Sequence, residues 1–349
     1  MSDKLITSIY EITKKIHDPV SNQALDQNNP NLNIACNKGH ANIAIKINPK
    51  DKLIYEDLSI EIKKALNAIK ELLSINIIFT SENISAPQSE ELAKNKRFKI
   101  NAKKIIAIAS GKGGVGKSTF AVNFATALKK QGFSIGILDA DIYGPSVPRM
   151  MGISGRPQAN EENKLIPLEN YGVKCMSIGF LIGVDTPTIW RGPMIMKALE
   201  QMYNGVEWGK LDYLIIDLPP GTGDAQLTLA QNSKLTGTII VSTPQDVALN
   251  DVRKGINMFK KVGVPVLGIV ENMSYFICSN CNERHEIFSN GGAKQEAENF
   301  KTSFLGELPI DKKLRIHSDE GQPVCISEPD SPISKIYMSI AKTVHTNLN

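Results

Sequence analysis

The clearest chemical signal in this 349-residue chain is a glycine-rich segment that could bind phosphate. Residues 111–118 read Gly-Lys-Gly-Gly-Val-Gly-Lys-Ser and match the pattern G-x-x-x-x-G-K-S/T. Glycines let backbone N–H groups turn toward phosphate oxygens, and a helix beginning at Ser118 adds its positive end. We expect Lys117 to contact the β- and γ-phosphates of a nucleotide and the Ser118 hydroxyl to ligate Mg²⁺. A chance glycine-rich turn is the alternative, but a predicted strand before the segment and a predicted helix after it favour phosphate binding.

Three aspartates lie at the ends of predicted strands and could complete this site. Asp139 and Asp141 follow a predicted strand at 134–138, and Asp217 follows one at 213–216. Open α/β sheets bind ligands at the carboxyl ends of their strands. We expect Asp217 to hold Mg²⁺ through water and the following loop to sense the γ-phosphate. A single aspartate at a strand end would favour a structural role, whereas three near a phosphate loop favour a functional one.

A pair of cysteines two residues apart is the second chemical signal. Cys278-Ser-Asn-Cys281 could bind one metal centre. A redox pair usually begins a helix, and residues 280–286 are too polar to predict one. A zinc site needs four ligands; His285 could supply a third, but the chain has no second C-x₂-C. A cluster shared across a two-fold axis needs only two cysteines from each chain, and we favour this interpretation. A structural role is expected for the other three cysteines, Cys36, Cys175 and Cys325.

The composition places limits on the function. Hydrophobic residues make up 42% and charged residues 22%, which is typical of a globular protein, and five cysteines do not form a disulfide framework. The net charge of +4 is too small to indicate nucleic-acid binding. No apolar run approaches the roughly 20 residues of a membrane span, and the N-terminus does not resemble a secretory signal. We therefore expect a cytoplasmic protein without a nucleic-acid or membrane partner.

The elements that must position these residues fall into two predicted domains. Residues 1–80 alternate helical and strand spacing and predict a small α+β domain, followed by a polar linker at 81–103. Residues 104–349 alternate buried strands with amphipathic helices, which predicts an α/β fold with a doubly wound, mostly parallel sheet. The expected strands of this domain are at 105–109, 134–138, 213–216, 238–242 and 266–270, and the expected helices are at 118–131, at 247–262 and from about 331 onward.

Longer motifs resemble a known family. GKGGVGKST at 111–119, LDADIYGPS at 138–146, WGKLDYLIIDLPPGTGD at 208–224 and ENMSYFICSNC at 271–281 are similar to the Mrp/ApbC family of iron–sulfur cluster carrier ATPases. The resemblance covers about residues 100–345. It implies a P-loop ATPase of the deviant Walker A subclass, which also contains MinD and ParA. It further implies a homodimer that bridges a [4Fe–4S] cluster through Cys278 and Cys281 of each chain, receives the cluster from a scaffold donor and transfers it to apoproteins.

The resemblance also implies roles for individual residues. Lys112 corresponds to the lysine that reaches the partner subunit's nucleotide, Asp141 to the residue that orients the attacking water, and Asn272 to the residue that recognises adenine. The ATP-binding segment that the family motif covers is Gly111, Lys112, Gly113, Gly114, Val115, Gly116, Lys117, Ser118 and Thr119.

Two alternatives to the carrier remain at this stage. One is a nucleotide-driven positioning switch of the MinD or ParA type, although residues 335–349 lack the strongly basic amphipathic character of a membrane-binding helix. The other is an ATPase whose cysteine pair holds structural zinc. The first domain also departs from the family pattern, because residues 54–58 stand where such domains carry a Cys-Pro pair. We therefore expect a docking role for it.

Overall fold

The computed structural model describes residues 2–37, 40–48, 51–69, 71–72, 74–80, 100–142, 144–181 and 192–349. The chain divides into two compact units, residues 1–95 and 96–349. Most of the predicted linker, residues 81–99, lies outside the described residues, and its last two residues belong to the first strand of the second unit.

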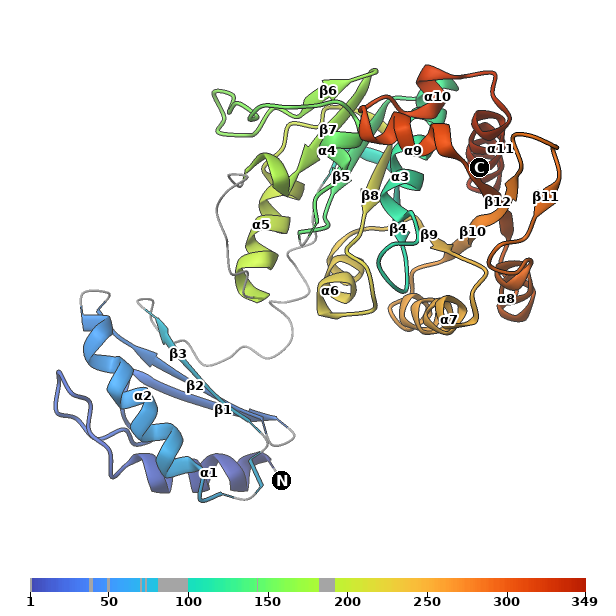
Figure 1. Ribbon diagram of the computed structural model, residues 1–349. Coiled ribbons are helices and arrows are strands. Elements are labelled where there is room, and N and C mark those ends of the chain that lie inside the picture. The colour runs from blue at the N-terminus through green and yellow to red at the C-terminus, as the bar shows by residue number, and fades with distance from the viewer. Residues whose placement is uncertain are drawn as a thin grey trace. The chain divides into compact units, whose positions relative to one another are not determined.

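The first unit packs two helices against a three-stranded sheet (Figure 1). The sheet has the order β1-β2-β3, with β1 antiparallel and β3 parallel to β2. Alternating isoleucines such as Ile43 and Ile45 are fully buried against Ile9 and Ile62. The elements are α1 (Ser2–Thr13), β1 (Leu32–Asn37), β2 (His40–Lys46), α2 (Lys52–Leu66) and β3 (Ser74–Thr80).

Helical apolar spacing extends over residues 58–73, but α2 ends earlier, at Leu66. Ile69 and Leu72 continue the apolar spacing, but they pack on the core from a turn. Where the family pattern has a Cys-Pro pair, this unit has a buried tyrosine. The Tyr55 hydroxyl donates a hydrogen bond of 2.8 Å to the Asp18 carboxylate.

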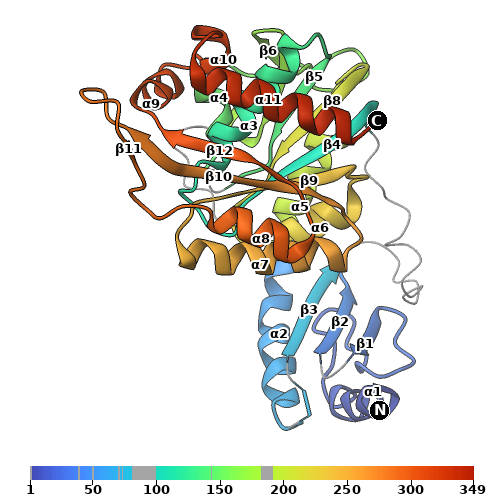
Figure 2. The ribbon, with the colours of Figure 1, turned by 90° about the vertical axis from the view of Figure 1, so that its right-hand side faces the viewer.

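The second unit is built on a nine-stranded sheet of order β11-β10-β9-β4-β8-β5-β7-β6, with β12 paired to β10 (Figure 2). Only β6 and β11 run antiparallel to their neighbours, so the predicted mostly parallel sheet is confirmed. Every residue of β5 and β9 is buried, as expected for strands covered on both faces. The strands are β4 (Ala102–Ala109), β5 (Ile135–Asp139), β6 (Leu168–Asn170), β7 (Val173–Ser177), β8 (Leu211–Asp217), β9 (Gly237–Ser242), β10 (Val266–Ile277), β11 (Arg284–His285) and β12 (Phe304–Ile310).

Helices cover both faces of this sheet. Figure 2 shows α3 and α11 on one face and α7 and α8 on the other. The ring centroids of Phe120 and Phe124 in α3 are 5.5 Å apart, and those of Phe120 and Tyr337 of α11 are 5.9 Å apart. These ring contacts pack α3 against α11. The Ser331 hydroxyl caps α11 by accepting a hydrogen bond from Ser334 N. The helices are α3 (Lys117–Lys130), α4 (Val147–Met150), α5 (Gly192–Asn204), α6 (Asp224–Asn232), α7 (Asp246–Lys261), α8 (Gly292–Phe300), α9 (Lys312–Asp319), α10 (Val324–Ser327) and α11 (Pro332–Asn347).

The strand order places the three expected acidic positions together. β4 lies between β9 and β8, and β5 lies on the other side of β8. In the parallel register Asp217 stands opposite both Ile108 of β4 and Asp139 of β5. The carboxyl ends of β4, β5 and β8 therefore meet at one edge of the sheet, where the P-loop begins. Among the described residues, no helix combines the length and apolar character needed to cross a membrane.

Candidate nucleotide site and cysteine hairpin

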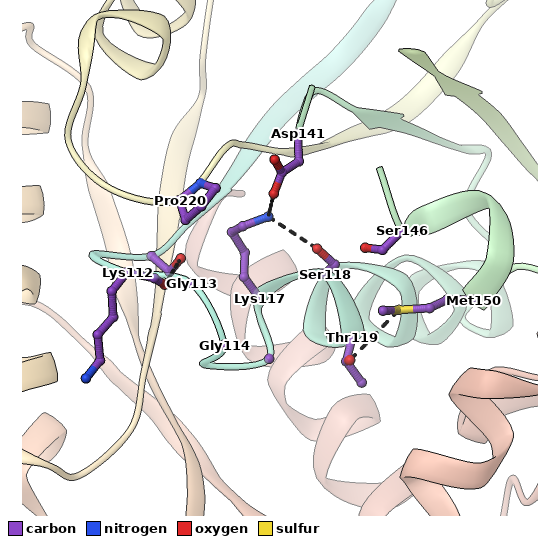
Figure 3. Close-up of a pocket in the computed structure, with 12 residues that line it drawn as sticks. Lys112, Gly113, Gly114, Lys117, Ser118, Thr119, Asp141, Ser146, Met150 and Pro220 are labelled. Atoms are coloured by element: carbon purple, nitrogen blue, oxygen red, sulfur yellow. Dashed lines mark hydrogen bonds and ion pairs between the residues drawn. The ribbon is translucent and has the colours of Figure 1, made fainter. Parts of the chain in front are cut away.

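The P-loop connects β4 to α3 and borders a cavity of about 200 Å³ (Figure 3). Its glycines are required by the backbone. Gly114 and Gly116 have φ values of +81° and +84°, a region that residues with a Cβ rarely adopt. A Cβ on Gly116 would lie 2.2 Å from Asn272 Nδ2, and one on Gly111 would lie 2.3 Å from Asp251 Cβ. The loop therefore packs tightly against β10 and α7 while leaving its other side open to a ligand.

Lys117 is the electrostatic centre of the site. Its Nζ lies 2.7 Å from Asp217 Oδ1, 3.2 Å from Ser118 Oγ and 3.6 Å from Asp141 Oδ2. The Ser118 hydroxyl also donates to Asp217 Oδ2. Lys117 is 6% exposed and Asp217 fully buried, so each charge depends on the other for compensation. The structure thus brings together four residues that the sequence placed on three separate segments.

Asp139 supports the loop that carries Asp141. The Asp139 carboxylate is fully buried and accepts hydrogen bonds from Asp141 N at 3.1 Å, Val147 N at 3.2 Å and Ser177 Oγ at 3.0 Å. Burial, reinforced by the neighbouring Asp217 carboxylate, raises the pKa of Asp139 to about 8. Burial also raises the pKa of Asp217, against the opposing effect of Lys117. The contribution of Ser177 was not visible in the sequence, because a serine on a strand carries no distinguishing signal.

This raised pKa leads to a prediction about stability and pH. Between about pH 4 and about pH 8, folded Asp139 holds a proton that unfolded Asp139 releases. The free energy of unfolding of the nucleotide-free protein should therefore fall as the pH rises through this window. In Asp139→Asn, which has no proton to release, the fall should be smaller. Urea unfolding from about pH 5 to about pH 8 measures the two slopes, and identical slopes would contradict the assignment.

The side chain of Lys112, the other lysine of the P-loop, does not lie with Lys117 in the site. In Figure 3 its side chain points away from the cavity and from Lys117. Its carbonyl oxygen accepts a hydrogen bond of 2.9 Å from Ser110 Oγ, which fixes the backbone at this position. In this conformation the Lys112 ammonium does not serve the nucleotide site of its own chain.

Asn272 of β10 contacts the P-loop directly. Its Nδ2 donates a hydrogen bond of 2.8 Å to Val115 O, and the side chain is only 7% exposed. The contact holds the phosphate loop against β10, and Asn272 is not among the residues that line the cavity. Adenine recognition by Asn272 stays a prediction.

Cys278 and Cys281 lie at the tip of a β-hairpin, and we call residues 277–285 the cysteine hairpin. Ile277 of β10 pairs with Arg284 of β11. Within the turn, Cys278 N donates to Glu283 O and Asn282 N donates to Cys278 O, each at 2.9 Å. Asn282 adopts a φ of +58°, which closes the turn. The pair therefore does not begin a helix, the usual setting of a redox pair.

Both cysteines are accessible to solvent, and the thiol of Cys278 has a lowered pKa. Cys281 is exposed and Cys278 half-buried. Hydrogen bonds from the N–H groups of Cys281 and Asn280 lower the pKa of the Cys278 thiol. Two cysteines outside the hairpin differ in this respect, because burial raises the pKa of the Cys325 thiol to about 12. Burial also raises the pKa of Cys175 well above its ordinary value.

Polar contacts tie the hairpin to the sheet. The Arg284 guanidinium forms two hydrogen bonds to the Glu307 carboxylate of β12, at 2.9 and 3.0 Å, and stacks 3.9 Å above the Tyr275 ring. Ser274 Oγ lies 3.2 Å from Glu307 and 2.6 Å from Glu271. Buried Glu271 also accepts hydrogen bonds from two N–H groups at the start of α8. β10 thus carries a continuous set of contacts from the P-loop to the cysteine hairpin.

Comparisons with known proteins agree with this geometry. The family model of the ParA group, described as NUBPL iron-transfer P-loop NTPase, matches residues 101–345. The iron–sulfur protein required for NADH dehydrogenase of Arabidopsis thaliana mitochondria is 57% identical over 69% of this chain and 78% of its own length. The iron–sulfur cluster carrier protein of Escherichia coli strain K12 is 49% identical over 81% of this chain and 79% of its own length.

Solved structures show the same fold. The nucleotide-binding protein of Archaeoglobus fulgidus, solved with ADP and with cobalt found in it, aligns with a TM-score of 0.59 and 43% identity, over 67% of this chain and 91% of its own. The cell-division ATPase MinD of Pyrococcus furiosus aligns with a TM-score of 0.52 at 21% identity, over 70% of this chain and 99% of its own, which supports the fold alone. The family expected from the motifs is thereby confirmed: the chain belongs to the NUBPL-type iron-transfer P-loop NTPases.

Proposed function

We propose that this protein is an ATP-hydrolysing carrier that binds a [4Fe–4S] cluster and transfers it to apoproteins. The observation that carries the proposal is the cysteine hairpin at the end of the strand whose Asn272 contacts the P-loop. Relatives named iron–sulfur cluster carriers support the same function. A MinD-type positioning switch would leave the accessible cysteine pair without a role.

ATP binding would exchange the charge partners of Lys117. Its ammonium is now paired with Asp217, and the incoming β- and γ-phosphates would take this place. The Ser118 hydroxyl and the Asp217 carboxylate are oxygen donors of the kind that Mg²⁺ prefers, and they already lie within hydrogen-bond distance of one another. The metal would neutralise phosphate charge, and Asp141, at 3.6 Å from Lys117, would orient the attacking water.

Hydrolysis would require two chains. Lys112 points away from its own cavity, which suits a cation supplied to the partner subunit's nucleotide, as an arginine finger is. The cluster would require the same dimer, because a [4Fe–4S] cluster usually takes four thiolates and each hairpin offers two. We therefore propose a homodimer with both Lys112 side chains and both hairpins facing the interface.

Lys112→Ala tests this arrangement. The variant should bind ATP normally and hydrolyse it more slowly, on the order of 10³-fold, the lower end of what an arginine finger supplies. Lys254→Ala is the matched control, because Lys254 is an exposed lysine paired with Asp251, next to the P-loop. Steady-state phosphate release and equilibrium binding of an ATP analogue measure the two properties. A normal rate in Lys112→Ala would remove the lysine from catalysis.

A transfer assay tests the carrier function itself. The full chain is reconstituted anaerobically with iron and sulfide, separated from free iron, and mixed with an apoenzyme that needs a [4Fe–4S] cluster for activity. Recovery of acceptor activity, faster than with equivalent free iron and sulfide, is the expected result. Recovery no faster than with the free ions would contradict a carrier. The natural donor scaffold and clients, the cytoplasmic location and the docking role of the first unit stay predictions.

A further inference from the structure

Three different metal-ligating side chains converge at the turn of the cysteine hairpin. The Cys281 thiol, a Glu283 carboxylate oxygen and a His285 ring nitrogen all lie within 4.8 Å of one another. All three side chains are exposed, and His285 Nε2 lies 3.9 Å from Glu283 Oε2. The proposed carrier function uses Cys281 but assigns nothing to Glu283 or His285.

Local backbone geometry explains the convergence. Glu283 directly precedes β11 and His285 ends it, so the two side chains are two residues apart and lie on the same side of the chain, and the turn at Asn282 brings Cys281 back beside them. The hydrogen bond between Cys278 N and Glu283 O holds the two sides of the turn in register. Arg284 lies between the two ligands in sequence, but its guanidinium is paired with Glu307.

The donor set suits one divalent cation of intermediate softness. Zinc binds thiolate sulfur, imidazole nitrogen and carboxylate oxygen at about 2.0–2.3 Å, which sets tetrahedral ligand separations of roughly 3.3–3.8 Å. The three groups need only a small closing movement to reach these separations, and exposed side chains make it freely. A thiolate and a carboxylate together balance the two positive charges of the ion.

We propose that a single chain binds one Zn²⁺-like divalent cation through Cys281, Glu283 and His285. The fourth position is open to water or to the adjacent Cys278 thiol, which hydrogen-bonds Cys281. Binding releases the Cys281 thiol proton to solvent and involves no redox change. Where the proposed function holds, this site and the shared cluster exclude one another, because both use Cys281. A chain that holds the cation therefore carries no cluster.

Cobalt titration of the reduced, cluster-free full-length protein tests the site, since Co²⁺ reports its ligands through its absorption spectrum. We expect one Co²⁺ per chain, a thiolate-to-cobalt charge-transfer band, and displacement by Zn²⁺. His285→Ala and Glu283→Ala should each weaken binding about tenfold or more, because each removes one ligand. Glu286→Ala is the matched control, because Glu286 is an exposed glutamate just beyond the hairpin and outside the group of three.

Other outcomes would overturn the inference. Half an equivalent of Co²⁺ per chain, with unchanged affinity in His285→Ala, would show a cation held between two chains by thiols alone. The absence of a charge-transfer band would show that Cys281 is not a ligand.

Cluster reconstitution of His285→Ala separates this inference from the proposed function. Both hold if this variant keeps its cluster iron and loses cobalt affinity. If wild-type protein forms a cluster but binds no cobalt, only the inference fails. If it binds cobalt but forms no cluster, only the carrier function fails.

Discussion

Lys117→Ala is expected to abolish ATP hydrolysis and to destabilise the fold at the same time. Removing a single electrostatic donor from a reaction centre costs about 10²–10³-fold in kcat, and Lys117 is also expected to hold the β- and γ-phosphates in the cavity that it lines. The substitution leaves Asp217 fully buried without its partner, next to Asp139. Breaking a buried ion pair in this way costs about 3–5 kcal/mol. Phosphate release and urea unfolding measure the two effects.

A double variant separates the two effects. In Lys117→Ala with Asp217→Asn, both members of the buried pair are neutral, so most of the lost stability should return. Hydrolysis should stay absent, because neither the phosphate contact nor the carboxylate is present. An equally unstable double variant would show that the charge pair is not the source of the loss. Hydrolysis at the normal rate in Lys117→Ala would contradict the P-loop assignment.

Cys278→Ala and Cys281→Ala should each lose the reconstituted cluster. Wild-type protein should hold about four irons per dimer, as four thiolates from two hairpins require. The variants should keep their fold and ATP binding, because the P-loop contacts β10 through Asn272 rather than through the hairpin. Iron and sulfide analysis with the visible absorption spectrum, measured beside ATP-analogue binding, gives both results.

Cysteines outside the hairpin provide the controls. Cys36→Ala, in the sheet of the first unit, and Cys325→Ala, buried in α10, should keep their iron. A cluster in the Cys278→Ala, Cys281→Ala double variant would place the ligands elsewhere. A cluster on a strict monomer would rule out the bridging arrangement.

The nucleotide site was largely predictable because its signals are local. The glycine spacing specifies the loop, and continuous apolar runs specify the parallel strands that end beside it. The sequence could not show that Asp139 and Asp141 have different roles. Asp139 and Asp141 look alike in sequence and both are buried, yet Asp139 holds the loop through hydrogen bonds while Asp141 faces Lys117. That difference depends on Ser177 and on Val147 N, which only the folded sheet brings close.

The region around the cysteines was less predictable for a physical reason. The strand expected at 266–270 continues to Ile277, and the neighbouring β12 was not expected at all. Glu271, Asn272 and Ser274 interrupt the apolar pattern although all three are buried. Their polar groups are satisfied by the P-loop, by α8 and by Glu307, contacts that are distant in sequence. Periodicity therefore suggests a strand end where the chain in fact continues.

The length of β10 limits how the protein can be dissected. Asn272 and Cys278 lie six residues apart, on a stretch of chain with an irregularity at Met273, so the span between them is at most about 20 Å at 3.3 Å per residue. A deletion of the hairpin also deletes Arg284, so the ion pair between Arg284 and Glu307 is lost at the ends of β10 and β12. Removing the hairpin would therefore disturb β10 and β12 together with the cysteines, whereas point substitutions at Cys278 and Cys281 leave these contacts in place.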